Sequence, residues 1–144
     1  METIAIGSDH GGINLKNKII EYLDANKIQY KDFGTFNTQS CDYPIIARTV
    51  ANSVANKEYT KGILVCGSGV GMSIVANKVK GIRALVCSDT YTAKKSREHN
   101  NANILCLGER VIGFDLAYDI VDIWLNTNFE IGGRHQRRVD MIEE

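Results

Sequence analysis

The sequence predicts a three-layer α/β/α domain, Rossmann-like, with a five-stranded parallel sheet and a C-terminal helical arm. Short runs of β-branched and apolar residues alternate with longer stretches whose apolar residues recur at helical spacing. Most of the short runs are apolar throughout, which is typical of parallel strands buried on both faces. A chain of 144 residues can bury a core but is short for two domains, so residues 1–144 are predicted to form a single domain.

The first half of the chain contains two strand signals and two helix signals. Asp42 stands where the cap of the second helix belongs, and Pro44, the only proline, suits a first helical turn, which needs no N–H donor at that position. Alternation of strands and helices predicts right-handed crossovers between parallel strands. Strands are expected at residues 3–7 and 28–33, and helices at residues 13–25 and 43–56.

The second half continues the alternation and ends in a separate segment. Its tail, residues 132–144, returns to helical composition after the polar stretch 126–128. We therefore expect the tail to leave the main body as an arm that reaches across the surface or a partner chain. Strands are expected at residues 62–66, 82–87 and 103–107, and helices at residues 70–78, 90–100 and 114–125.

Composition and charge exclude several classes of protein. Lys plus Arg and Asp plus Glu both number 17, so no overall positive field exists to hold nucleic acid or an anionic membrane surface. No apolar run approaches the roughly 18 to 20 residues that span a bilayer. The chain is therefore expected to be cytoplasmic, with neither nucleic acid nor a membrane as partner.

The four cysteines are far apart and form no C-x-x-C pair, which excludes a zinc knuckle and a thioredoxin-type motif. They are expected to be free thiols. Cys87 and Cys106 lie in apolar strand-like runs, where a thiol acts as a small buried hydrophobe. Cys41 lies in a polar loop and indicates nothing further.

A glycine-rich turn, residues 66–71, joins a buried strand to a helix. Backbone N–H groups converge at such a turn, at the positive end of the helix, and favour an anion, an oxyanion or the thiolate form of Cys66. The alternative is a tight turn that simply packs strand against helix, with Cys66 buried. The turn alone does not decide between the two, because a lone glycine-rich turn is a weak signal.

Three familiar glycine loops do not fit this turn. A dinucleotide fingerprint needs glycine where this chain has Met72, and it opens the first strand–helix unit of the fold. The Gly-Lys-Ser/Thr of a triphosphatase loop occurs nowhere in the chain. A cysteine phosphatase has arginine six residues after its cysteine, again at Met72.

Polar residues at other element ends add candidates. His10 follows Asp9 directly after the first strand, and His99 ends the helix before the fifth strand, where local charge can make it an acid or base. Arg134 and Arg138 are four residues apart, so on a helix they share a face and could hold a phosphate or carboxylate. The alternatives are structural or merely exposed histidines and a solvated basic patch.

Several motifs occur together, in order, over nearly the whole chain, and they resemble ribose-5-phosphate isomerase type B. The resemblance implies a cofactor-free, metal-free aldose–ketose isomerase of ribose 5-phosphate and ribulose 5-phosphate with a dimeric active unit, a homodimer or a dimer of dimers. The motifs lie at residues 8–12, 42–44, 62–71, 76–78, 81–84, 96–100, 108–111 and 132–136.

The resemblance also implies roles for individual residues. Cys66 would be the base that moves the proton, His99 the acid/base that opens the sugar ring, and Asp9 the group that handles a sugar hydroxyl. The backbone of the glycine turn would stabilise the enediolate, Asn100 would contact the sugar, and the arginines and His10 would hold the phosphate. The implied substrate-binding set is Ser8, His10, Gly67, Ser68, Gly69, Val70, Gly71, Asn100, Arg110, Arg134 and Arg138.

Other functions stay open at this point. Family members without the cysteine use a glutamate where this chain has Met72, so the thiolate route is favoured here. A six-carbon substrate, allose 6-phosphate or galactose 6-phosphate, is an alternative, and so is a non-catalytic sugar-phosphate sensor on the same fold. We also expect the His99 that acts with a given Cys66 to belong to the partner chain.

Overall fold

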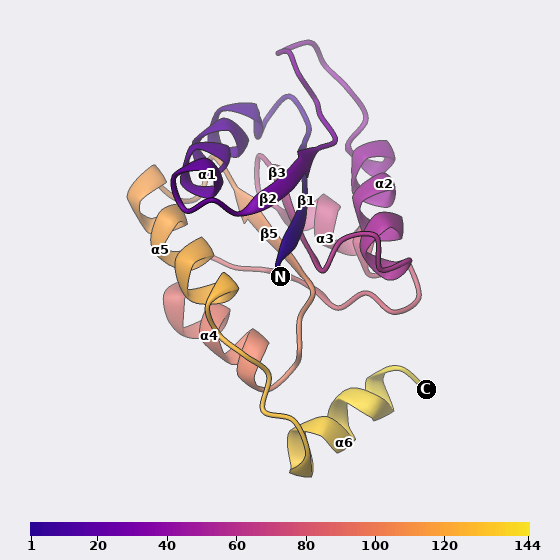
Figure 1. Ribbon diagram of the computed structural model, residues 1–144. Coiled ribbons are helices and arrows are strands. Elements are labelled where there is room, and N and C mark those ends of the chain that lie inside the picture. The colour runs from indigo at the N-terminus through magenta and orange to yellow at the C-terminus, as the bar shows by residue number, and fades with distance from the viewer.

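A computed structural model describes residues 1–144 and contains one five-stranded, all-parallel sheet with six helices (Figure 1). The predicted α/β/α architecture is confirmed. The strands are β1 (Thr3–Ser8), β2 (Gln29–Asp32), β3 (Lys61–Cys66), β4 (Ala84–Val86) and β5 (Ile104–Gly108). The helices are α1 (Ile13–Ala25), α2 (Tyr43–Ala55), α3 (Val70–Ala76), α4 (Thr90–Glu98), α5 (Phe114–Leu125) and α6 (Gly133–Ile142).

Two hydrophobic cores lie on the two faces of the sheet. One joins α1, α4 and α5 to the sheet and is centred on large side chains such as Trp124 and Leu105. The other joins α2 and α3 to the opposite face. Figure 1 shows these two helical layers on either side of the strands. Alternate residues of β3, such as Leu64 and Val65, contribute to different cores, which is why the strand is apolar throughout.

The strand order β2-β1-β3-β5-β4 differs from the two common orders of doubly wound sheets. The chain passes from β3 to the edge strand β4 and then returns, so that β5 lies inside the sheet. As an edge strand β4 pairs with β5 alone. It is only three residues long, whereas the sequence indicates six, because Ile82 is bound into a turn with Val79 instead.

Helix boundaries agree closely with expectation, and the caps show one difference. The α1 and α5 bounds are those predicted. Asp42 is the N-cap residue of α2 as expected, but its side chain makes no capping hydrogen bond. Asp89 caps α4 through its carboxylate, which accepts a hydrogen bond from Thr92 N–H at 2.6 Å.

The final helix α6 forms the predicted arm. It lies apart from the layers, beyond the end of α4, and is reached by an extended link from α5 (Figure 1). Only Val139 of α6 is buried. An ion pair of 2.6 Å between Arg83 Nη1 and Glu143 Oε1 fastens its far end. No helix in the chain combines the length and the apolar character that crossing a bilayer requires.

Candidate active site

The residues that follow β1, β3 and β5 meet at the carboxyl edge of the sheet. The register pairs Ser8 with Val65 and Cys66 with Gly108, so the ends of the three strands lie side by side. This arrangement brings Asp9, the glycine turn and Arg110 together, as the sequence predicts. The carboxyl edge is where open α/β sheets bind ligands.

Cys66 is the last residue of β3, and its side chain points into the glycine turn. The residue is 7% exposed, and its Sγ accepts a hydrogen bond from Gly69 N–H at 3.0 Å. Gly69 is the N-cap of α3 and has φ of +83°, a left-handed conformation that favours glycine. This conformation aims the Gly69 N–H back at the sulfur.

The same turn presents further donors. The N–H groups of Gly67, Ser68 and Gly71 donate to no protein acceptor, whereas Val70 N–H is taken up by Ser68 Oγ at 3.2 Å. Three unpaired N–H groups beside a sulfur form a site for a negatively charged oxygen. These free N–H groups are available to a ligand.

Three polar side chains surround this turn. Asp9 is almost buried, and its Oδ1 accepts from Gly11 N–H at 2.9 Å, which leaves Oδ2 without a protein donor. His10 is exposed, and its Nδ1 accepts from Cys41 N–H at 3.2 Å. The Arg110 N–H donates to Gly67 O at 3.1 Å, which holds the Arg110 side chain over the turn.

Two predicted positions have side chains placed differently from the rest. Ser8 is fully buried, and its Oγ has no hydrogen-bond partner, so the hydroxyl lies beneath the ligand-facing surface. Val70 is half exposed at the first turn of α3. Its contribution to a site is therefore its position beside the unpaired N–H groups.

Tyr43 is not among the site residues expected from the sequence, but it lies against the glycine turn. A Cβ on Gly71 would meet the Tyr43 ring at 2.5 Å, so the ring covers the start of α3. The available signal was its position beside Asp42 and Pro44 in one of the matched motifs.

All four cysteines are free, as expected. Cys87 and Cys106 are buried, also as expected, and burial raises the pKa of both thiols. Both therefore stay protonated at neutral pH. Cys41 is half-buried.

The remaining predicted residues lie at the opposite end of the sheet. Gly62 N–H bonds to the carbonyl of Asn103, so the chain enters β5 beside the beginning of β3, whereas Cys66 lies at its end. The five residue steps from Asn103 to Gly108 span roughly 16 Å. His99, the C-cap of α4, precedes this entry and therefore lies at the amino edge.

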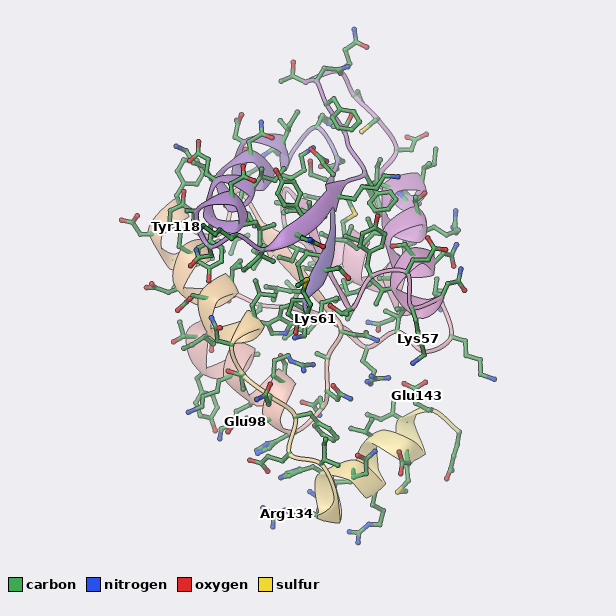
Figure 2. The ribbon with its side chains drawn as sticks, in the orientation of Figure 1. Lys57, Lys61, Glu98, Tyr118, Arg134 and Glu143 are labelled. Carbon is green, nitrogen blue, oxygen red and sulfur yellow. The ribbon has the colours of Figure 1, made fainter.

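His99 faces the arm. Its ring stacks on that of His135 with the ring centroids 3.8 Å apart, and Glu130 N–H bonds to the carbonyl of Glu98. Figure 2 shows Glu98 at the end of α4 beside the first turn of α6, where Arg134 projects outward. Arg138 is also exposed on α6. The amino edge thus gathers His99, Asn100 and both arginines of the arm.

His99, Glu130 and His135 place potential metal-ligand atoms within 4.8 Å of one another. The two rings are within 9° of parallel, however. A metal ion lies in the plane of each imidazole that binds it, so one ring would have to rotate before both could share an ion. Partial burial, His99 and Arg134 lower the pKa of His135, which favours its neutral form beside His99.

Two cavities lie away from Cys66. One, of about 860 Å³, separates the end of the arm from β4 and α4 and includes Asn100 in its wall. The other, of about 350 Å³, lies at the amino edge of the sheet.

Comparison with known proteins defines the class of this protein, the sugar-phosphate aldose–ketose isomerases. The ribose/galactose isomerase family model matches residues 4–142, and the chain belongs to that family. No predicted fold feature conflicts with this assignment.

Individual relatives agree over nearly the full length. The chain is 50% identical over 142 residues to ribose-5-phosphate isomerase B of Escherichia coli, covering 99% of this chain and 95% of the relative. A D-erythrulose-4-phosphate isomerase of Pectobacterium atrosepticum is 46% identical over 92% of this chain and 88% of its own. The solved structure of ribose-5-phosphate isomerase B from Clostridium thermocellum has a TM-score of 0.96 at 55% identity, covering 98% and 95%.

Proposed function

We propose that this chain interconverts ribose 5-phosphate and ribulose 5-phosphate through an enediolate, without metal or cofactor. It acts as a cytoplasmic homodimer, or a dimer of dimers, in which residues 1–144 form one catalytic domain. The observation that carries the proposal is the Cys66 sulfur held at 3.0 Å by Gly69 N–H, beside three unpaired N–H groups. The names of the relatives in Escherichia coli and Clostridium thermocellum support the substrate.

The isomerisation itself moves one proton between neighbouring carbons. The Cys66 thiolate takes the proton from C2 of the open-chain aldose, and the electron pair moves to the C1 carbonyl oxygen. The unpaired N–H groups of the glycine turn hold that oxyanion. Cys66 then returns its proton to C1, while Asp9 takes the proton from the C2 hydroxyl and passes it to the C1 oxygen. The product is the ketose, and each enzyme group ends as it began.

Ring opening comes first, and it requires an acid and base beside the ring oxygen and the anomeric hydroxyl. His99 of the partner subunit would take the proton of the anomeric hydroxyl and deliver one to the ring oxygen. The separation of Cys66 from His99 by the length of the sheet supports a site made of two chains. A two-fold dimer would pair the carboxyl edge of each chain with the amino edge of the other.

The residues proposed to bind the phosphate are also divided between the two ends of the sheet. His10 and Arg110 lie beside Cys66, whereas Arg134 and Arg138 lie on the arm. In a shared site the arm of the partner subunit would complete the grip. Exposed apolar side chains near the carboxyl edge support a covered surface there: Val70 and Ile74 on α3 are about half exposed.

A different sugar phosphate is the main alternative. The family name includes galactose isomerases, and the Pectobacterium relative is named for a four-carbon substrate. A non-catalytic sensor finds no support among these relatives, which are named as isomerases.

A coupled isomerase assay separates these possibilities. We expect turnover of ribose 5-phosphate to exceed that of allose 6-phosphate, galactose 6-phosphate and D-erythrulose 4-phosphate, and to be unchanged by a chelator. A preference for one of the other sugars would overturn the substrate. Loss of activity with the chelator would overturn the metal-free mechanism.

A further inference from the structure

A second group of charged side chains lies at the amino edge of the sheet, outside the proposed catalytic groups. It lines the pocket of about 350 Å³. Figure 2 places Lys57 and Lys61 on this side of the chain, with Glu143 of the arm beyond them. The polar wall of the pocket includes Lys57, Lys61, Arg83, Arg97, Asn101 and Asn103.

Arg97 is the most unusual of these residues, because its guanidinium is buried without a carboxylate. The residue is 7% exposed and forms no ion pair. Its hydrogen bonds go to neutral oxygens: the carbonyls of Thr127 at 3.2 Å and Ala102 at 2.6 Å, and Asn101 Oδ1 at 3.0 Å. Its Nη2 donates to no protein acceptor. Buried charges are normally paired, and burial lowers the pKa of this guanidinium.

The other cations are only partly balanced. Lys61 Nζ is paired with Glu2 at 2.5 Å, and Arg83 Nη1 with Glu143 at 2.6 Å, both near chain ends. Lys57 is exposed and has no partner. Four cations therefore face two carboxylates, which leaves two positive charges in excess. Glu2 is the one acidic group beside Lys61 and Arg97.

We propose that this pocket is a second anion-binding site, for small phosphorylated molecules that carry at least two negative charges. Phosphate oxygens accept hydrogen bonds from the free Nη2 of Arg97, from the Lys57 ammonium and from the Asn101 side-chain amide, whose N–H groups donate to no protein acceptor. The volume is at the low end of small-molecule sites, which suits a compact anion.

The pocket also touches both elements that carry the second half of the proposed active site. Arg97 and Asn101 flank His99 on either side in the chain. Arg83 connects the pocket to the arm through Glu143. A bound anion would therefore stabilise the loop of His99 and the arm, although the site itself does not depend on the proposed isomerase activity.

Calorimetric titration with inorganic pyrophosphate at low ionic strength tests the site. The full chain should carry Arg134→Ala and Arg138→Ala, so that the arm contributes no phosphate contact. Asn101→Asp places a carboxylate beside Arg97, and aspartate has nearly the same size as asparagine. Aspartate also tolerates the φ of +48° at this position. Asn37→Asp is the matched control, because it makes the same charge change in an exposed loop and keeps its bond to Gln39 N–H.

We expect pyrophosphate to bind the Asn37→Asp chain, and Asn101→Asp to weaken binding at least about tenfold with no loss of thermal stability. Equal affinities in the two variants, or no binding to either, would overturn the proposal.

A second pair of variants compares the loss of a positive charge at the pocket, at Lys57, with the same loss elsewhere on the surface, at Lys27. Lys57 and Lys27 are both exposed, follow a helix and have positive φ, so asparagine suits both positions. We expect Lys57→Asn to weaken pyrophosphate binding about threefold and Lys27→Asn to leave it unchanged. Equal effects would show only a response to net charge and would contradict a localised site.

Discussion

Among single residues, Cys66 carries the proposed chemistry. Replacing Cys66 with alanine removes the proposed base and leaves a small side chain in a nearly buried site. We expect turnover to fall at least about 10²-fold while the melting temperature changes little. Steady-state rates and thermal unfolding of purified Cys66→Ala measure the two effects.

Cys41→Ala is the control for this substitution. Cys41 binds His10 only through its backbone N–H, so the variant should keep both its activity and its sensitivity to an alkylating reagent. Ribose 5-phosphate should protect the Cys66 thiol from alkylation. A Cys66→Ala enzyme with more than about a tenth of wild-type turnover would show that another group is the base.

The two arginines of the arm are predicted to hold the phosphate of the substrate. Arg134→Ala or Arg138→Ala should weaken binding of the phosphorylated sugar by about 1.5 to 3 kcal/mol, the contribution of a hydrogen bond to a charged group. Inhibition constants of phosphorylated and unphosphorylated ribose analogues measure the effect. Arg137→Ala, on the same exposed helix, should leave the ratio unchanged. Equal losses for both analogues would mean that the arginines do not contact the phosphate.

At the scale of elements, the end of β5 supports the glycine turn. A Cβ on Gly108 would lie 2.7 Å from the carbonyl oxygen of Ser68, a backbone atom that can yield only if the turn shifts. Displacement of a catalytic group by about 1 Å costs on the order of 10²-fold in rate. We expect Gly108→Ala to lose far more activity than stability, as measured by turnover and melting temperature.

Gly113→Ala provides the comparison for Gly108. Nothing lies within 4 Å of a Cβ at Gly113, and its φ of −78° is open to alanine. This variant should keep full activity. Similar losses in both variants would show that the β5 end has no special part in shaping the turn.

Much of this architecture can be predicted from sequence because local rules determine it. The apolar spacing of α1 and α5 sets their bounds, and the apolar run of β3 indicates a strand buried on both faces. The position of β5 between β3 and the edge strand β4 could not be predicted, because it depends on packing between distant elements. The unpaired N–H groups of the turn likewise depend on the φ of Gly69, which the glycine permits but does not require.

The placement of the candidate site residues at two opposite edges of the sheet could be predicted from the sequence. Residues after a parallel strand lie at its carboxyl edge, and residues before one lie at the amino edge. Cys66 follows β3, whereas His99 precedes β5, so the two belong at opposite edges. The stacking of His99 on His135 could not be predicted, because it depends on the path of the link to the arm.

At the scale of the whole molecule, each chain carries two half-sites. One, around Cys66, has the proposed base and the proposed oxyanion donors. The other, around His99, has the proposed ring-opening group and the arm. Because the two half-sites lie at opposite ends of the sheet, a second chain is needed to complete each proposed site.

Complementation between two inactive variants tests this requirement most directly. We expect Cys66→Ala and His99→Ala chains to be inactive alone, whereas a mixed dimer would have one site with both lesions and one with neither. Random exchange should restore about a quarter of wild-type activity, since half of the dimers are mixed and each has one intact site. If mixtures that exchange subunits, as mass spectrometry of a tagged chain would show, remain inactive, the two-chain site is wrong.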